Sequence, residues 1–286
     1  MKYEKTQKAE LSILVYSCWK NSDMWAVFIR LFRKYWHDCA YPLVLLTDKV
    51  GDSGEKYGFD EVVVLDGNWN EMVLAGMNAL PTQYVMLWMD DYLLCDDVDN
   101  HDIALYMNIA QQYHAANIRL MESPSIKSGT FAKDERLNCY KQGSAYSFST
   151  QVGIWDVKLL KKYIKNYQTP WDFERKGSVE IKDEKHPLLA PKYYTFPYEE
   201  GVRQGKWLDN GVRLCKRNNI TLDFKKRRPM RSFELAWIYF KGGILELNPT
   251  LIVKIQNIWN DVKNHVKEGS MKVRFNKLLG KPEDRP

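Results

Sequence analysis

Short apolar runs alternate with helix-patterned stretches through the first third of the chain, and this alternation limits the fold more than any other feature. Residues 11–17 (LSILVYS) predict a buried first strand. Residues 24–36 place apolar side chains at i, i+3, i+4 and i+7, the spacing of an amphipathic helix, and Ser22 or Asp23 can serve as its N-cap. The next elements predicted are strands at 43–47 and 61–65, a helix at 70–80 and an apolar strand within 83–94.

Strands that alternate with helices predict an α/β fold with a largely parallel central sheet and helices on both faces. Ligands of such sheets bind at the carboxyl ends of the strands. We therefore expect the loop at 18–23, Asp48, and Asp90 with Asp91 to lie near one another, because each follows a predicted strand.

The second half of the chain is less regular. Residues 170–205 are rich in aromatic, proline and charged residues and look like loops over a site. From residue 248 the pattern is helical and ends in a polar tail, so we expect a catalytic domain at 1–247 and a helical C-terminal extension at 248–286. The other elements predicted here are helices at 102–115 and 157–167 and a strand at 151–155.

The composition indicates a protein with a packed core, a reducing environment and no membrane-spanning helix. With 286 residues and 45% apolar content, the chain can bury a substantial core. The five cysteines are widely spaced and form no C-x-x-C pair, which favours a reducing compartment. The N-terminus is polar, and no apolar run reaches the roughly 18 residues of a membrane span. We therefore predict a cytoplasmic protein.

The most informative polar feature is the pair Asp90 and Asp91, which follows the apolar run YVMLWM. Carboxylates at the end of a buried strand need a counter-charge, and a hard cation such as Mg²⁺ or Mn²⁺ supplies one. Such an ion takes few carboxylates and completes its shell with water and diphosphate oxygens. Alternatively, the two carboxylates cap a turn or pair with Arg or Lys. Two adjacent aspartates, taken without their context, slightly favour this structural role.

Three stretches extend the interpretation: SCWKNSDMWAVFIRLFRKYWHDCAYPLVLLTD, YVMLWMDDYLL and QVGIWDVKLLKKYIKNYQTPWDFE. They resemble a family of bacterial capsular-polysaccharide and lipopolysaccharide glycosyltransferases with the GT-A fold, over roughly residues 11–210. The resemblance implies an Asp-x-Asp-like metal site at the acidic pair. Because the two carboxylates are adjacent here, either can touch the metal. We assign Asp91 to Mn²⁺ or Mg²⁺ and Asp90 to the nucleotide side.

The same resemblance implies that the chain transfers a sugar from a nucleoside-diphosphate donor to a hydroxyl of a glycan or lipid-diphosphate-linked acceptor in surface-polysaccharide synthesis. An inverting transfer needs a base for the acceptor hydroxyl. Asp172 and Glu174 are the candidates, because period-two spacing in an extended loop points both side chains the same way. We prefer Glu174. The alternative is that these carboxylates cap a loop or a helix that begins after Pro170.

Further residues are candidates for donor binding. The side chains after the first strand can line the nucleotide base or ribose, and Asp48 can do the same from the second strand. Asp23 is equally suited to cap the following helix, and Asp48 is equally suited to be a turn or cap residue. A lysine in the Gly-Lys-Trp sequence can reach the diphosphate. The donor-site candidates are Ser17, Trp19, Asp23, Asp48, Asp90 and Lys206.

The net charge of +6 is concentrated in one segment. Residues 203–231 carry ten Lys or Arg against Asp209 and Asp223. With the lysines after residue 248, this basic segment can hold the protein against an anionic membrane surface, at the inner face of the cell membrane. The alternative is a solvated surface without a partner. No nucleic-acid partner is expected, because no RNP, zinc-finger or helix-turn-helix pattern accompanies the charges.

Two other classes remain open. A sugar nucleotidyltransferase shares the α/β core and the acidic metal ligands. It is expected to carry a Gly-rich phosphate loop after the first strand, whereas this loop, SCWKNSD, has no glycine. The other interpretation is a non-catalytic protein, either one that keeps the fold and binds a glycan or a nucleic-acid-binding protein, which would explain the basic segment and the many aromatic residues.

Overall fold

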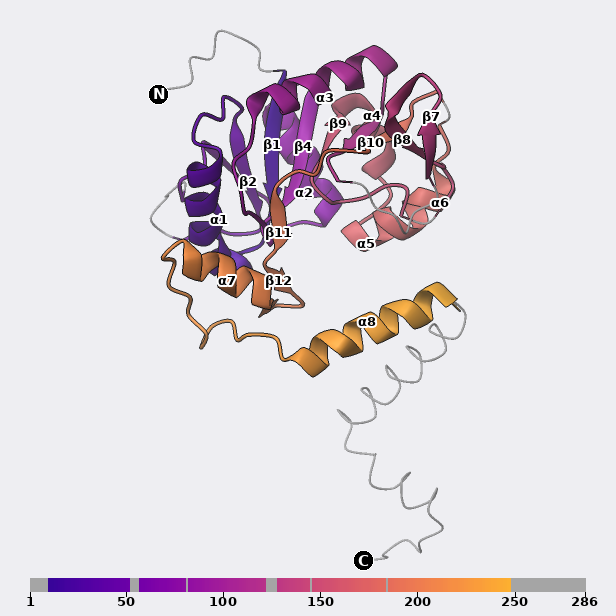
Figure 1. Cartoon of the computed structure of the whole chain (residues 1–286). Coiled ribbons are helices and arrows are strands. Elements are labelled where there is room, and N and C mark those ends of the chain that lie inside the picture. The colour runs from indigo at the N-terminus through magenta and orange to yellow at the C-terminus, as the bar shows by residue number, and fades with distance from the viewer. Residues whose placement is uncertain are drawn as a thin grey trace, which may run out of the picture. The chain divides into compact units, whose positions relative to one another are not determined.

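A computed structural model describes residues 10–51, 57–80, 82–121, 128–144, 146–183 and 185–247 (Figure 1). The chain divides into two compact units, residues 1–229 and 230–286, and each is described by itself. The elements of the first unit are β1 (Leu11–Tyr16), the 3-10 helix η1 (Trp19–Asn21), α1 (Ser22–Tyr35), β2 (Leu43–Thr47), β3 (Glu61–Val64), α2 (Trp69–Ala79), β4 (Tyr84–Met89), β5 (Tyr92–Leu94), α3 (Asn100–Tyr113), β6 (Asn117–Arg119), β7 (Ser128–Phe131), β8 (Asp134–Tyr140), β9 (Gly153–Asp156), α4 (Val157–Ile164), α5 (Pro170–Asp172), the π-helix η2 (Phe173–Gly177), α6 (Ser178–Glu180), β10 (Leu188–Pro191), β11 (Tyr198–Glu200), β12 (Val202–Arg203), β13 (Lys206–Trp207) and α7 (Asp209–Arg217).

The described part of the first unit is organised around a nine-stranded sheet in the order β3-β2-β1-β4-β9-β6-β10-β8-β7. Strands β3, β2, β1 and β4 are parallel to one another. Strand β9 runs antiparallel to both β4 and β6, so β6 has the same direction as β4. Strand β10 is parallel to β6, and β8 and β7 complete the sheet with antiparallel pairs. The fold is therefore mixed α/β with a mostly parallel core, in agreement with the predicted class.

Helices cover both faces of this sheet, because successive strand side chains point to opposite sides. Ile13 and Val15 of β1 pack in one core with α1 and α3, whereas Leu14 packs in the other core with α2. Helix α2 lies close to the sheet: a Cβ atom at Gly76 would be 2.6 Å from Leu46 Cδ2. The apolar stripe of α1, which the sequence predicts, is buried as expected, with Trp25 and Phe28 almost inaccessible.

Most elements predicted in the first third are confirmed to within two residues at each end. The expected strand at 83–94 is instead two strands. Only β4 joins the large sheet, whereas β5 pairs with β11 in a separate two-stranded sheet. The N-cap of α1 also differs from the prediction, because Asn21 occupies that position.

The expected loops at 170–205 are largely regular structure. Residues 170–180 form a continuous helical segment of α5, η2 and α6, which begins at the Thr169 cap with Pro170 in the first turn. Proline favours this position because its missing N–H is not needed there. Strands β10, β11 and β12 occupy much of the remainder.

The second unit contributes one described helix, α8 (Ser232–Leu247). The aromatic side chains Phe233, Trp237 and Phe240 are exposed, and the rings of Trp237 and Phe240 stack at 5.6 Å. The predicted extension at 248–286 lies outside the described residues, so its boundary stays a prediction. Within the described part of the chain, no helix is long and apolar enough to span a membrane.

Candidate active site

Polar side chains gather at the carboxyl edge of the sheet. Because β1, β2, β4 and β6 share one direction, the residues that end or follow them meet at one edge. Ser17 Oγ donates a hydrogen bond of 2.5 Å to Asp90 Oδ2. The backbone N–H of Trp19 donates to Asp48 Oδ1 at 2.6 Å. The predicted convergence of the 18–23 loop, Asp48 and Asp90 is therefore confirmed.

Asp90 lies in a buried polar network. Its side chain is 4% exposed, and Trp25 Nε1 donates to Ser17 Oγ at 2.7 Å from behind. Burial raises the pKa of Asp90 to about 6, although the hydrogen bond from Ser17 and the charge of Arg227 lower it. Asp90 thus has donors on the protein side and is fixed in position at the end of β4.

Asp91 has the opposite environment. Its Oδ1 atom is buried without a hydrogen-bond partner. Burial raises the pKa of Asp91 well above its usual range, and the charges of Asp90 and Glu200 raise it further. A buried acceptor of this kind is costly to leave unpaired, and a cation would satisfy it.

The residues fit a metal that is only partly held by protein. Among the described residues, no group of three or more His, Cys, Asp or Glu side chains is arranged to bind a cation. A Mg²⁺ or Mn²⁺ ion bound at Asp91 would therefore take most of its ligands from diphosphate and water, as such ions do in sites of this kind.

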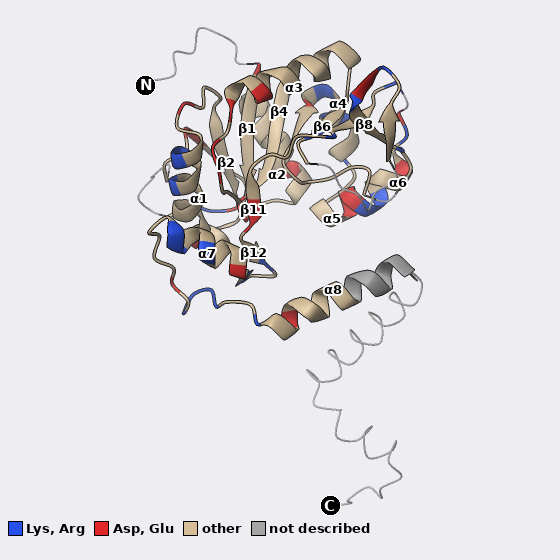
Figure 2. Cartoon of the chain, viewed as in Figure 1, with Lys and Arg blue, Asp and Glu red and all other residues tan. Residues whose placement is uncertain are grey.

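Glu174 acts electrostatically on Tyr92, the residue that follows Asp91. Burial raises the pKa of Tyr92, and the negative charges of Asp91, Glu174 and Glu200 raise it further, so all three carboxylates lie within electrostatic reach of this phenol. Glu200 belongs to β11, which is seen as an acidic strand in Figure 2, and pairs directly with Tyr92 of β5. The Tyr92 ring also lies 4.9 Å from the ring of Tyr198.

Three hydrogen bonds orient the Glu174 carboxylate. Its Oε1 accepts from the backbone N–H of Thr150 at 2.7 Å, from Thr150 Oγ1 at 2.8 Å and from Ser149 Oγ at 3.4 Å. All three bonds end on the same oxygen, which leaves Oε2 outside this set. The sequence does not predict that Ser149 and Thr150 donate to Glu174.

Asp172 does not share this environment. The expectation of an extended loop is wrong, because residues 170–180 are helical and side chains two positions apart on a helix diverge. Asp172 instead accepts a hydrogen bond from Thr169 Oγ1 at 2.9 Å and forms an ion pair of 3.2 Å with Lys176. These are the contacts of a helix start, which was the alternative interpretation.

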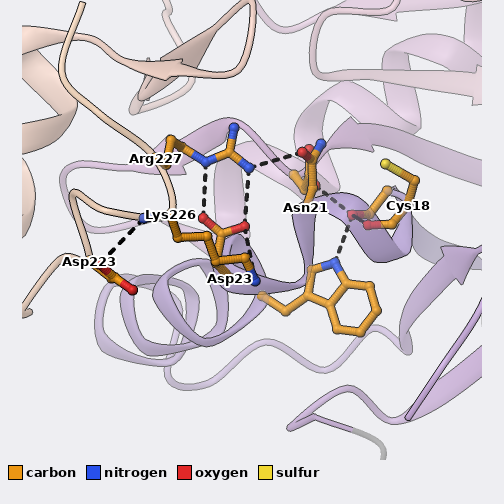
Figure 3. A network of polar contacts seen from close by, with 9 residues as sticks. Cys18, Asn21, Asp23, Asp223, Lys226 and Arg227 are labelled. Carbon is orange, nitrogen blue, oxygen red and sulfur yellow. Dashed lines mark hydrogen bonds and ion pairs between the residues drawn. The ribbon is translucent and has the colours of Figure 1, made fainter.

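Asp23 is engaged by the basic segment (Figure 3). Arg227 is 6% exposed, and its Nε and Nη2 atoms donate to the two Asp23 oxygens at 3.0 and 3.1 Å. Its Nη2 also donates to Asn21 Oδ1 at 2.9 Å, and Lys226 Nζ lies 3.8 Å from Asp23. Arg227 therefore fixes the loop after β1 through Asp23, which is not the helix cap, and the predicted contact of Asp23 with the donor stays a prediction.

Lys206 lies in β13, opposite Arg203 of β12. Arg203 itself forms an ion pair with Glu200, and its Nε donates to Glu200 Oε1 at 2.7 Å. The predicted contact of Lys206 with a diphosphate stays a prediction.

Several residues of this region were not anticipated from the sequence: Tyr92, Arg119, Tyr198, Glu200 and Arg227. For Arg119 a signal exists, because it ends the short run AANIR in the manner of the other strand-terminal polar residues. For Arg227 the sequence offers only a cluster of four adjacent cations, of which the third is buried.

No protein-family model matches this chain, and no curated protein matches it in sequence. Solved structures are similar in part. Staphylococcus aureus TarS 1–349 gives a TM-score of 0.43 at 12% identity, covering 66% of this chain and 60% of that one. The same fragment in complex with UDP gives 0.43 at 13% identity, covering 75% and 67%. A UDP-glucose pyrophosphorylase complexed with UDP-glucose gives 0.42 at 9% identity, covering 67% and 92%.

The chain spans 60% of the TarS 1–349 fragment and 41% of a longer TarS structure. The chemistry of the site rests on its own geometry.

Proposed function

We propose that this chain is a GT-A-type glycosyltransferase, which moves a sugar from a nucleoside-diphosphate donor to a hydroxyl of a glycan or lipid-linked glycan. The observation that carries the proposal is the contrast between two carboxylates that both act electrostatically on Tyr92. One, Asp91, has a buried oxygen without a partner, and the other, Glu174, is oriented by three hydrogen bonds. A site for a cation and a carboxylate that can act as a base are the groups that sugar transfer from a diphosphate requires.

The residues would divide the work as follows. Asp91 would hold Mn²⁺ or Mg²⁺, and such an ion would supply charge neutralisation for the leaving diphosphate. Asp90, fixed by Ser17, would take the nucleotide side, where Trp19 and Asp48 would contact the base or ribose. Glu174 removes the proton from the acceptor hydroxyl. Asp23 contributes indirectly, since it fixes the loop through Arg227.

A donor screen tests this function. The protein is incubated with UDP-, GDP-, CMP- and dTDP-sugars, with and without Mn²⁺, while released nucleotide and heat of binding are measured. We expect binding of one donor class, strengthened by Mn²⁺, and slow release of nucleotide that an acceptor accelerates. If no nucleotide sugar binds under either condition, the proposal is wrong.

The same screen separates the nearest rival, a sugar nucleotidyltransferase. That enzyme would condense a nucleoside triphosphate with a sugar 1-phosphate and release diphosphate. Diphosphate release from these substrates, without transfer from a nucleotide sugar, would favour it. A protein that binds a nucleotide sugar and neither transfers nor hydrolyses it would be the non-catalytic glycan-binding alternative.

We also propose a cytoplasmic location at the inner face of the cell membrane, where a lipid-diphosphate acceptor is presented. All five cysteines fall within the described residues and are unpaired there. Lys225, Lys226 and Arg228 are exposed, and α8 follows them with exposed aromatic side chains. Arg227 is excluded from such a surface by its ion pair. Sedimentation with anionic vesicles at low and high salt tests the proposal, and salt-insensitive or absent binding contradicts it.

A further inference from the structure

The candidate base Glu174 lies in a π turn rather than in a regular α-helix. Residues Phe173–Gly177 form η2, and the N–H of Ser178 reaches back five residues to the carbonyl of Phe173. Single π turns are rare and frequent at functional sites. Phe173 is fully buried in an aromatic cluster, whereas Glu174, the next residue, is turned toward the loop at 146–150.

This loop is bound to the π turn at two points of its backbone. The N–H of Tyr146 donates to the Glu174 carbonyl at 3.1 Å. The N–H of Phe148 donates to Ser178 Oγ at 2.9 Å. The other side of the loop is held by Arg119, which is buried at the end of β6 and donates through Nη2 to the Tyr146 carbonyl at 2.9 Å. The loop is therefore fixed both to the π turn and to the central sheet.

The loop ends at the Glu174 carboxylate, where three hydrogen bonds meet one oxygen. Thr150 is 5% exposed, and it donates to Oε1 twice, from its N–H at 2.7 Å and from its Oγ1 at 2.8 Å. Ser149 Oγ adds a longer bond of 3.4 Å to the same atom. None of these three bonds reaches Oε2. A carboxylate that a rigid loop holds at one oxygen presents the other oxygen in a fixed direction.

We propose that Thr150 is a positioning residue for the transfer reaction, which holds Glu174 at Oε1 so that Oε2 takes the proton of the acceptor hydroxyl. The inference rests on the proposed function and adds the oxygen that reacts and the residue that directs it. In this step the acceptor oxygen forms a bond to the anomeric carbon of the sugar. The bond from that carbon to the diphosphate breaks with its electron pair on the diphosphate, and the proton passes to Oε2.

Thr150→Val tests the role, because it removes the Oγ1 donor and retains the shape of the side chain and the backbone N–H. Water can replace the acceptor hydroxyl, so slow hydrolysis of the donor measures the same proton transfer. UDP-glucose, GDP-mannose and dTDP-glucose are each supplied with Mn²⁺. Release of nucleoside diphosphate is measured in single turnovers, and affinity by calorimetry. For the donor that the wild type hydrolyses, we expect release about tenfold slower and affinity within about twofold of wild type.

Two further variants separate positioning from a general effect on the fold. Thr150→Ser restores the hydroxyl without the methyl group and should recover most of the rate. Thr82→Val is the matched control, because it removes a hydroxyl that donates to the Tyr84 carbonyl at 2.8 Å, at the start of β4 and away from Asp90 at its end. It should leave the rate unchanged. If Thr150→Val failed to fold, or if Thr150→Ser were equally slow, the hydroxyl would not be the positioning group and the proposal would be wrong.

The double variant that combines Thr150→Val with Glu174→Gln shows whether Thr150 acts through Glu174. Once the base is gone, its orientation no longer matters to the rate. The double variant should therefore release nucleotide within about twofold of Glu174→Gln alone. Independent roles would multiply the two losses, and that result overturns the proposal.

The hydrolysis rates also separate this proposal from the proposed function. If Glu174→Gln loses hydrolysis and Thr150→Val is as fast as wild type, the positioning role is wrong and the proposed function stands. If the wild type hydrolyses none of the nucleotide sugars, the function fails and the positioning role fails with it.

Discussion

Two buried polar regions of the first unit differ in how completely their polar atoms are paired. Around Arg227, which joins the basic segment to the loop after β1, the guanidinium meets both oxygens of Asp23 and the side chain of Asn21. At the carboxyl edge of the sheet, Asp91 and Arg119 each keep a buried atom without a partner. The first arrangement stabilises the fold, whereas the second costs stability unless a bound group supplies the missing partners.

The comparison predicts different outcomes for substitutions in the two regions. Changes at the edge should reduce binding or turnover and leave the fold equally or more stable. Changes at the Arg227 network should lower stability first, with effects on binding that follow from movement of the loop.

The largest effect is expected for Glu174→Gln. Glutamine can still accept from Thr150 and keeps the shape of the side chain, but it cannot take a proton. We expect transfer to fall by about 10³-fold, while the affinity for the nucleotide sugar stays within about twofold. Single-turnover assays with calorimetry measure both. Equal losses of binding and transfer would show that Glu174 holds the substrate rather than acting as the base.

Arg227→Met should give the largest loss of stability. It leaves Asp23 without its main partner, and we expect the free energy of unfolding to fall by about 3 kcal/mol. Arg213→Met is the matched control, because the Arg213–Asp209 pair is exposed on α7, and its loss should stay within about 0.5 kcal/mol. Urea unfolding distinguishes the two. If both variants lost a similarly small free energy of unfolding, the Arg227 network would not be the stabilising region that the comparison requires.

Asp91→Asn should separate stability from function. The neutral amide avoids burying an unpaired charge beside Asp90, so the metal-free protein should gain about 1 kcal/mol of stability. Stabilisation of the protein by Mn²⁺ plus nucleotide sugar should disappear in the same variant. Thermal unfolding with and without these ligands tests both halves. A variant that is less stable without metal would show that the carboxylate has a structural partner.

Asp172→Asn should have the smallest effect. Asp172 contacts Thr169 and Lys176 near the surface, so we expect a loss of stability below about 1 kcal/mol and transfer within about twofold of wild type. Urea unfolding measures the stability, and the single-turnover assay used for Glu174→Gln measures the transfer. A large loss of transfer would exchange the roles of the two carboxylates.

Much of the fold was predictable because local patterns carry it. The spacing of apolar residues predicts β1, α1 and β2 in this order. Asp90 and Asp91 follow β4, as the apolar run before them predicts. The antiparallel β9 was not predictable, since strand direction depends on pairing between distant segments. The helical segment at 170–180 was missed because its proline and charged residues resemble a loop until the Thr169 cap is recognised.

The site was predictable only where a local pattern places its residues. Ser17, Asp48 and Asp90 could be placed because each directly follows a strand. The donors to Glu174 come from residues 149 and 150, and the partner of Asp23 comes from a segment with no pattern of its own. Contacts of this kind depend on the folded topology and not on local sequence.

The Arg227 contact with Asp23 joins residues that are 204 positions apart. During synthesis the N-terminal strands and α1 emerge long before residue 227 does, and they can pack with each other while the rest of the chain is still being made. The loop after β1 obtains its fixed shape only when the end of the first unit has left the ribosome. A chain interrupted before residue 227 would therefore lack this fixation of the loop after β1.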